Sequence, residues 1–336
     1  MKIISRIGCV AAAAALAMGL FALPGCTVST TSGSTSASGT ASVGTFRTVD
    51  EIKDSGTIRI GVFSDKSPFG YVDEHGDYQG YDIELAEQIA EDMGVELDYV
   101  STEAANRIEY LQTGKVDIIL ANFTVTEERA EVVDFADPYM NVALGVVSPN
   151  DNVITSLDQI GPDDQVIVIS GTTAETYLTK NNPEIKLQKY DTYAAAKTAF
   201  ENGNGVAWAN DNTEVIAFAN ATDGYTVGIE SLGDADVIAP AVAKGNTSLL
   251  DWLNDDLARL GAQGFFHKAY EKTLLDTYGA DYEDTLVVEP GVEAGAASDD
   301  QIARLPQGEE VYGEVDNDPA AQQGAAEGEQ IAEELS

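Results

Sequence analysis

Apolar residues recur at strand and helix spacing through the first half of the chain. Thr57–Val62 predicts a buried strand, and the apolar positions from Tyr81 onward keep a helical spacing until Gly94. Three further elements are expected in the order strand, helix, strand: Val95–Tyr99, Ala105–Gln112 and Val116–Leu120. This order predicts a parallel α/β sheet, and ligands bind such sheets beyond the carboxyl ends of the strands.

The same alternation restarts further along the chain and predicts a second lobe. We interpret Pro138–Ala143 as the first crossover to this lobe and Val237–Val242 as a return strand. The elements predicted between them are strands at Val166–Ile169 and Val206–Ala209, and helices at Ala174–Lys180, Tyr193–Phe200 and Val215–Ala219. The amphipathic stretches that follow are expected to be helical and to pack back on the first lobe.

The stretch Ala121–Met140 carries candidate chemistry directly after a predicted strand. Asn122 and Thr124 offer hydrogen-bond donors, and Thr126 can cap a helix whose first turn is acidic. The guanidinium of Arg129, which follows, can hold a carboxylate by two parallel hydrogen bonds. From this stretch alone, a helix start with a surface arginine is an equally good interpretation.

The composition excludes several kinds of partner and site. Lys plus Arg number 18 against 57 Asp plus Glu, and the formal net charge of -39 repels nucleic acid. Because the cysteines are Cys9 and Cys26, the body of the chain has no disulfide, no cysteine-based zinc site and no cysteine nucleophile. His75 and His267 are isolated, and we expect no metal and no cofactor.

The two ends of the chain differ in character from its body. Residues 1–25 combine a charged start with an apolar run and predict a signal peptide. Residues 26–46 predict a flexible linker, and residues 289–336 predict a disordered acidic tail. Leu23-Pro24-Gly25-Cys26 resembles the lipobox of bacterial lipoproteins, which implies a lipid anchor on Cys26. The alternative is an ordinary signal peptide followed by a chance cysteine.

Several blocks of residues keep the order and spacing of one family. They are Ile60-Gly61-Val62 with Pro68-Phe69-Gly70, Gly80-Tyr81-Asp82-Ile83, Thr124-Val125-Thr126-Glu127-Glu128-Arg129, Val133-Asp134-Phe135 with Pro138-Tyr139, Gly171-Thr172-Thr173, and Asp211. From about Thr48 to Val288 the chain resembles solute-binding protein family 3, the polar amino-acid receptors of bacterial ABC importers.

This resemblance implies an α/β fold of the two-lobed, type II periplasmic-binding-protein kind. Each lobe would be a mostly parallel sheet flanked by helices, and two hinge crossovers would join the lobes. Residues 47–139 plus 239–288 would form lobe 1, and residues 140–238 would form lobe 2. The lobes would close on one amino acid and deliver it to an ABC permease with its ATPase. The receptor would be a monomer, lipid-anchored at the outer face of the cytoplasmic membrane.

The resemblance also implies roles for single residues. Arg129 would hold the ligand α-carboxylate, and Asp211 would accept from the α-ammonium. A zwitterion buried between lobes needs such a fixed cation and fixed anion, because an unpaired buried charge is costly. Further contacts to the ligand are expected from Asn122 and Thr124 of the first lobe and from Gly171, Thr172 and Thr173 of the second.

The side-chain end of the ligand is open to more than one interpretation. Stretches such as Glu103-Ala104-Ala105-Asn106-Arg107 resemble a cysteine-binding subgroup, whereas in acid-binding relatives an arginine at the position of Arg107 reaches a side-chain carboxylate. Phe63 and Lys66 replace an acid and an aromatic residue found in many relatives, which argues against a cationic ligand. Phe69 is expected to line the site, with ordinary core packing as the alternative. A sensor and a dehydratase on the same fold are the rival functions.

Overall fold

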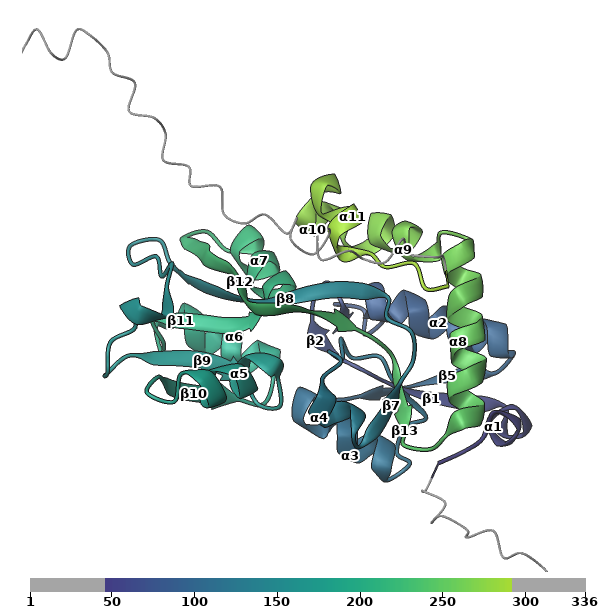
Figure 1. Ribbon diagram of the computed structural model, residues 1–336. Helices are drawn as coiled ribbons and strands as arrows, with labels where there is room; N and C mark the ends of the chain where they lie inside the picture. Colours follow the sequence, from purple (N-terminus) through teal and green to yellow (C-terminus); the bar gives the residue numbers. More distant parts are fainter. Residues whose placement is uncertain (1–45, 292–336) are drawn as a thin grey trace, which may run out of the picture. The chain divides into compact units, whose positions relative to one another are not determined.

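The computed structural model describes residues 46–291, which form two five-stranded sheets and one small three-stranded sheet (Figure 1). The predicted signal peptide and Cys26 lie outside these residues. In the first sheet, β5, β1 and β6 pair in parallel, and β6 and β7 both pair antiparallel to β13, so four of five strands run in one direction. Its strands, in spatial order, are β5 (Glu96–Ser101), β1 (Thr57–Val62), β6 (Ile118–Ile119), β13 (Ala241–Ala243) and β7 (Val133–Phe135).

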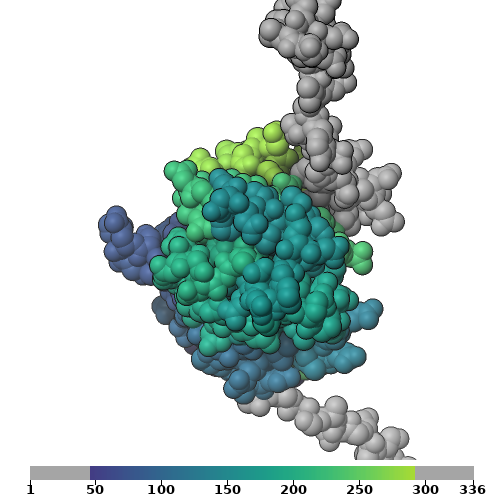
Figure 2. Space-filling model, turned by 90° about the vertical axis from the view of Figure 1, so that its left-hand side faces the viewer, coloured from purple at the N-terminus to yellow at the C-terminus, as the bar shows by residue number. Residues whose placement is uncertain are grey.

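The second sheet repeats this plan. Strands β10, β9 and β11 pair in parallel, and β11 and β12 both pair antiparallel to β8, so four of five strands again share one direction. Its strands, in spatial order, are β10 (Lys186–Tyr190), β9 (Gln165–Ile169), β11 (Ala207–Asp211), β8 (Met140–Pro149) and β12 (Tyr225–Ile238). In Figure 2 this part of the chain, in teal and green, faces the viewer. The predicted α/β class with mostly parallel sheets is confirmed.

Two neighbouring segments join the sheets. The chain passes from β7 to β8 through residues 136–139, and it returns from β12 to β13 through Ala239 and Pro240. Because Ile238 pairs with Met140, the two crossings lie side by side. The predicted return strand Val237–Val242 is divided at Pro240, which has no N–H to donate to a ladder.

The helices follow the strands largely as the apolar spacing predicts. Helix α2 begins after Gly80 and ends at Gly94 in the left-handed conformation, and its apolar face is buried in the core of the first sheet. Each fully buried aliphatic side chain of this kind contributes about 1.5–3 kcal/mol to stability. The α-helices are α1 (Val49–Ser55), α2 (Tyr81–Met93), α3 (Arg107–Gln112), α4 (Glu127–Ala130), α5 (Thr173–Asn181), α6 (Tyr193–Glu201), α7 (Asn212–Ala221), α8 (Thr247–Ala262), α9 (Phe265–Thr273), α10 (Leu275–Tyr278) and α11 (Glu283–Leu286).

Some strands differ from the sequence expectation. Of the predicted strand Val116–Leu120, only the two residues of β6 are in strand conformation. Neither β10 nor most of β12 was predicted. Both unpredicted strands lie at an edge of the second sheet and are largely half-exposed, so they lack a continuous apolar run. The third sheet, β2 (Asp65–Lys66), β3 (Gly70–Val72) and β4 (Tyr78–Gln79), was also not predicted, and it carries a site residue described below.

The described chain ends against the C-terminal helices. Glu289 accepts a 2.6 Å hydrogen bond at the ring of His267, and Pro290 is buried. The packed body therefore extends past Val288, to at least Pro290. Within residues 46–291, no helix combines the length and apolarity needed to cross a membrane.

Candidate functional site

The predicted site residues come from loops that follow parallel strands of both sheets. Asn122 and Thr124 follow β6, Gly171 follows β9, and Asp211 ends β11. Contacts between these loops are direct: the guanidinium groups of two arginines from the first sheet donate to the carbonyl oxygen of Gly171 in the second. The carboxyl ends of the two sheets therefore meet at one site, as the α/β pattern predicts.

Arg129 is held by backbone carbonyls of both loops. Thr126 caps α4, with its hydroxyl accepting from the Arg129 amide at 3.2 Å. The guanidinium donates to the oxygens of Thr124 at 2.6 Å and Gly171 at 3.0 Å, and it lies 4.8 Å from the ring centre of Phe123. Burial lowers the pKa of Arg129, and so does repulsion from a second guanidinium nearby, but an arginine stays protonated at neutral pH. Within residues 46–291, only two of its five N–H groups have a partner.

That second guanidinium belongs to Arg107, which is buried and largely occupied. Its Nε donates to Ala104, its Nη1 to Ala121 and Asn122, and its Nη2 to Gly171, all at backbone oxygens between 3.0 and 3.1 Å. Four of its five N–H groups therefore donate to backbone oxygens and hold the loops in place. This geometry makes Arg107 a positioning residue and leaves little of it for a ligand side chain.

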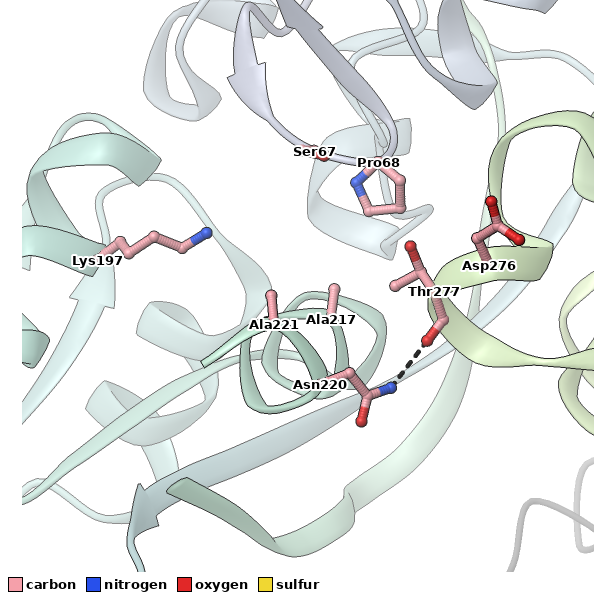
Figure 3. A pocket seen from close by; sticks show the side chains of 8 residues that line it. All are labelled: Ser67, Pro68, Lys197, Ala217, Asn220, Ala221, Asp276 and Thr277. Atoms are coloured by element: carbon pink, nitrogen blue, oxygen red, sulfur yellow. Dashed lines mark hydrogen bonds between the residues drawn. The ribbon is translucent and has the colours of Figure 1, made fainter. Parts of the chain in front are cut away.

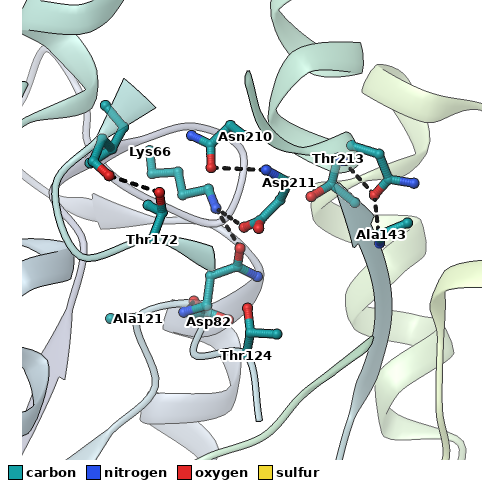
Figure 4. A network of polar contacts seen from close by, with 12 residues as sticks. Lys66, Asp82, Ala121, Thr124, Ala143, Thr172, Asn210, Asp211 and Thr213 are labelled. Carbon is teal, nitrogen blue, oxygen red and sulfur yellow. Dashed lines mark hydrogen bonds and ion pairs between the residues drawn. The ribbon is translucent and has the colours of Figure 1, made fainter. Parts of the chain in front are cut away.

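Asp211 is paired with a lysine of the small sheet (Figure 4). The Nζ of Lys66 donates to Oδ2 of Asp211 at 2.9 Å and also to Oδ1 of Asn122. Burial alone disfavours this ammonium, but Asp211, with weaker help from Tyr193 and Glu214, raises the pKa of Lys66 above its ordinary value. The carboxylate predicted to bind a ligand ammonium thus already faces one cation of the protein.

A second buried carboxylate fixes the loop after β6. Asp82, on α2, accepts from the amide of Asn122 at 2.8 Å and from the hydroxyl of Tyr139 at 2.6 Å. Burial raises the pKa of Asp82 to about 6 despite these two hydrogen bonds. Asn122 has a φ of 43°, a left-handed conformation that asparagine tolerates better than most residues, and the Asp82 bond holds it there.

The threonines of the second sheet have different surroundings. The Thr172 hydroxyl caps α5 by accepting from Glu175 and donates to Ile169 at 2.7 Å, so local bonds occupy it. Thr173 instead lines a cavity of about 440 Å³ together with Arg129. The remaining lining residues are Thr126, Glu128, Leu144, Thr176, Tyr177, Lys180, Asn181 and Asp236. Asp211 and Asn122 are not among them, so the predicted residues divide between this cavity and the buried Lys66 pair.

The predicted aromatic residues lie under the charged groups. Phe63 and Phe69 are buried, and the Lys66 ammonium lies 5.7 and 5.3 Å from their ring centres. Cations attract the faces of aromatic rings at such distances. Phe63 also packs edge-on against Tyr193 of the second sheet. The rings therefore belong to the core and at the same time form the floor beneath Lys66.

Several buried polar atoms around the Lys66 pair have no partner among the described residues. A buried donor or acceptor without a partner costs about 1–3 kcal/mol, so we expect water or another polar group to pair with these atoms. They are Asn122 Nδ2, Asn210 Nδ2, Thr213 Oγ1 and Glu214 Oε2.

A smaller cavity of about 260 Å³ lies elsewhere between segments of the two sheets (Figure 3). Ser67, Pro68 and Thr277 line one side, and Lys197 and Asn220 line the other. The Asn220 amide donates to the Thr277 oxygen at 2.8 Å across it. None of the predicted site residues lines this cavity, so it is separate from the candidate site.

Sequence reasoning missed three contributors to the site. In the sequence, Lys66 stands out only as a departure from relatives and Asp82 only as part of the block Gly80-Tyr81-Asp82-Ile83. Asp236 belongs to Leu232–Pro240, a stretch that resembles the cysteine-binding subgroup. Burial, with repulsion from Asp211, raises the pKa of Asp236 to about 6. An isolated lysine beside two phenylalanines was the signal available for Lys66. Among residues 46–291, no group of three or more His, Cys, Asp or Glu side chains is placed to hold a metal ion.

Comparisons with known proteins agree on one family. A family model for bacterial extracellular solute-binding proteins, family 3, matches residues 58–276. The glutamine-binding protein of an ABC transporter from Bacillus subtilis (strain 168) is 31% identical over 229 residues, which cover 67% of this chain and 84% of that protein.

Two solved structures resemble the chain more strongly in sequence. The solute receptor for L-cysteine of Neisseria gonorrhoeae is 51% identical, with a TM-score of 0.71 over 72% of this chain and 100% of that one. The cysteine-binding protein of Campylobacter jejuni is 48% identical, with a TM-score of 0.70 over 72% of this chain and 98% of that one.

Proposed function

Because the chain belongs to the bacterial extracellular solute-binding proteins, family 3, we propose that it is the receptor of an amino-acid ABC importer and that its ligand is cysteine. The observation that carries this proposal is that the Arg129 guanidinium donates across to Gly171 beside the second sheet, near enough to Asp211 for that carboxylate to offset part of the lowering of the Arg129 pKa. A fixed cation and a fixed anion on different sheets complement the two charges of an amino acid. The ligand itself then favours closure of the sheets on one another.

The free donors of Arg129 support its role toward the α-carboxylate. Arg129 lines a cavity that Thr173, at the start of α5 beside the second sheet, also lines. Thr124 and Asn122 supply the neighbouring backbone and side chain. In this arrangement the carboxylate receives hydrogen bonds from both sheets, and the ammonium shares Asp211.

Cysteine is favoured over an acidic ligand for two reasons. The two structural relatives at about half identity are named for cysteine. Arg107, the residue that would hold a side-chain carboxylate, spends four N–H groups on backbone oxygens. A glutamate or aspartate receptor stays the alternative, and it requires Arg107 to exchange at least one of those bonds for the ligand.

The same proposal covers the ends of the chain and the partners. Residues 1–25 act as an export signal, Cys26 carries a lipid anchor, and the closed receptor docks on a permease with its ATPase. Palmitate labelling of the natural chain and of Cys26→Ser tests the anchor, since only the natural chain incorporates label. We assign no catalytic step, and recovery of unaltered ligand after prolonged incubation distinguishes a receptor from a dehydratase on this fold.

A thermal-shift screen of residues 27–336 against single amino acids tests the ligand, with cysteine kept reduced and cystine tested separately. A ligand at about 100 times its Kd stabilises the folded state by about 2.7 kcal/mol, which raises Tm by several degrees. A shift with cysteine alone supports the proposal, and a shift with glutamate or aspartate selects the alternative. No shift with any amino acid refutes the proposed function.

A further inference from the structure

Lys66 is the one lysine among residues 46–291 whose side chain is wholly enclosed. It projects from β2, next to the first sheet, and its Nζ reaches Asp211 at the end of β11 in the second sheet. The side-chain exposures of the two partners are 0% and 7%, so water screens the pair very little. Three aromatic rings surround the ammonium at 5.0–5.7 Å, those of Phe63, Phe69 and Tyr193.

Among residues 46–291, one other ion pair joins the two sheets, and it is of a different kind. Lys180 pairs with Glu128 across the rim of the cavity, but the side chains are 58% and 65% exposed. Exposed pairs contribute little, whereas breaking a buried pair leaves one charge desolvated and without a partner. The Lys66–Asp211 pair is therefore the electrostatic contact between the sheets that the fold can least easily lose.

We propose that Lys66 determines the charge specificity of the site: it is the resident counter-ion of Asp211, which holds the two sheets together before a ligand arrives and excludes ligands with a cationic side chain. This inference rests on the proposed function, because it assigns Asp211 to the ligand α-ammonium. A ligand then shares Asp211 with Lys66 and does not find the carboxylate free.

The charges around Asp211 give the physical reason for the exclusion. Lys66, Arg107 and Arg129 place three cations around the site, and the carboxylates of Asp211 and Asp82 face them. The ligand carboxylate is attracted to the Arg129 guanidinium, and the ligand α-ammonium is attracted to Asp211. Two further carboxylates lie farther from this pair: Asp236 faces Arg129 from the cavity, and Glu214 acts on Lys66. A second ligand cation that approaches Asp211 meets the Lys66 ammonium, which already occupies that carboxylate. Ligands with neutral or acidic side chains are not repelled by Lys66 in this way.

The test compares Lys66→Met with the natural chain and with Lys186→Met. Methionine keeps the length and the aromatic contacts of Lys66 and removes the charge. Lys186 pairs with Asp163 at the surface of the second sheet, far less buried, and serves as the matched control. Small-angle scattering and Tm are measured first without any amino acid. Affinities for cysteine, serine and 2,4-diaminobutyrate, a cationic amino acid of similar length, are then measured by calorimetry.

Without amino acid, Lys66→Met should have a larger radius of gyration and a Tm lower by at least about 5 °C, whereas Lys186→Met should match the natural chain. With ligands, Lys66→Met should improve 2,4-diaminobutyrate binding relative to cysteine by at least about tenfold, because the ligand cation no longer meets the Lys66 charge and Asp211 is left without a counter-ion of the protein. If Lys66→Met does not fold, Lys66→Gln, which keeps a donor toward Asp211, replaces it with the same expected direction.

The outcomes separate the two proposals. If the natural chain binds cysteine but Lys66→Met keeps both the natural radius of gyration and the natural ligand ratio, the assignment of Lys66 is overturned and the proposed function stands. If the natural chain binds no amino acid, the proposed function fails, and the specificity role of Lys66 fails with it.

Discussion

Replacing Gly171 with alanine tests whether the loops of the two sheets touch in the ligand-bound protein. Gly171 has a φ of 80°, and a Cβ there would lie 2.5 Å from Cα and 2.7 Å from N of Ala105, on the first-sheet side. The conformation alone costs a non-glycine residue about 1–2 kcal/mol, whether the sheets are together or apart. The collision with a backbone arises only when the loops are in contact, and overpacking of this kind costs about 1–3 kcal/mol.

Gly203→Ala separates the two costs. Gly203 has a φ of 76°, and a Cβ there would meet no atom within 4 Å. In urea denaturation Gly203→Ala should lose about 1–2 kcal/mol of stability, and Gly171→Ala should lose more, because the loops already touch without a ligand and part of the collision cost adds to the cost of the conformation. Gly171→Ala alone should also bind cysteine about 5- to 150-fold more weakly by calorimetry, the range that corresponds to about 1–3 kcal/mol. Natural affinity in Gly171→Ala would show that the two loops do not meet in the bound state.

Three further substitutions test the charges of the site. Arg129→Lys should weaken cysteine binding by about 1.5–3 kcal/mol in calorimetry, because an ammonium cannot serve Thr124 and a ligand carboxylate in the planar geometry of a guanidinium; an unchanged Kd would remove Arg129 from the site. Asp211→Asn should lower stability in urea by about 3–5 kcal/mol, since the buried Lys66 ammonium loses its counter-ion, and a loss below about 1 kcal/mol would contradict a tight pair. Burial raises the pKa of Glu214 from 4.5 to about 7, so its protonated form stabilises the fold below about pH 4.5 and this contribution is lost as the pH rises through about 7. The free energy of unfolding of Glu214→Gln, relative to that of the natural chain, should therefore rise by up to about 3 kcal/mol between about pH 5 and pH 8. A stability difference in urea that is the same at the two pH values would refute the shift.

The periodic parts of the fold were predictable from the sequence. Helix α2 has apolar residues at helical spacing and a glycine at each end, and it occurs where that pattern places it. Strand β9 is buried on both faces from Val166 to Ile169 and is correspondingly a continuous apolar run, and β1 is marked by its buried Ile58, Ile60 and Val62. The short α4 was marked by its Thr126 cap and acidic first turn. Local propensity and hydrophobic period both point to these elements, so no distant contact is needed to identify them.

The edge strands and the buried ion pair depend on distant contacts. Strand β12 is half-exposed, contains two glycines and changes register several times against β8, so no period marks it. Lys66 and Asp211 are 145 residues apart, and nothing near either residue identifies the other as its partner.

The sequence by itself determined the alternation of strands and helices, the order of the blocks that identify the family, and the residue types able to bind a zwitterion. The tertiary structure decided how those residues are used. In the fold, Arg107 donates to backbone oxygens and Arg129 lines a cavity. Asp211 lies outside that cavity and forms a buried pair with a cation of the protein itself. The reason is physical: the cost of burying a charge depends on every group within a few ångströms, and only the fold brings those groups together.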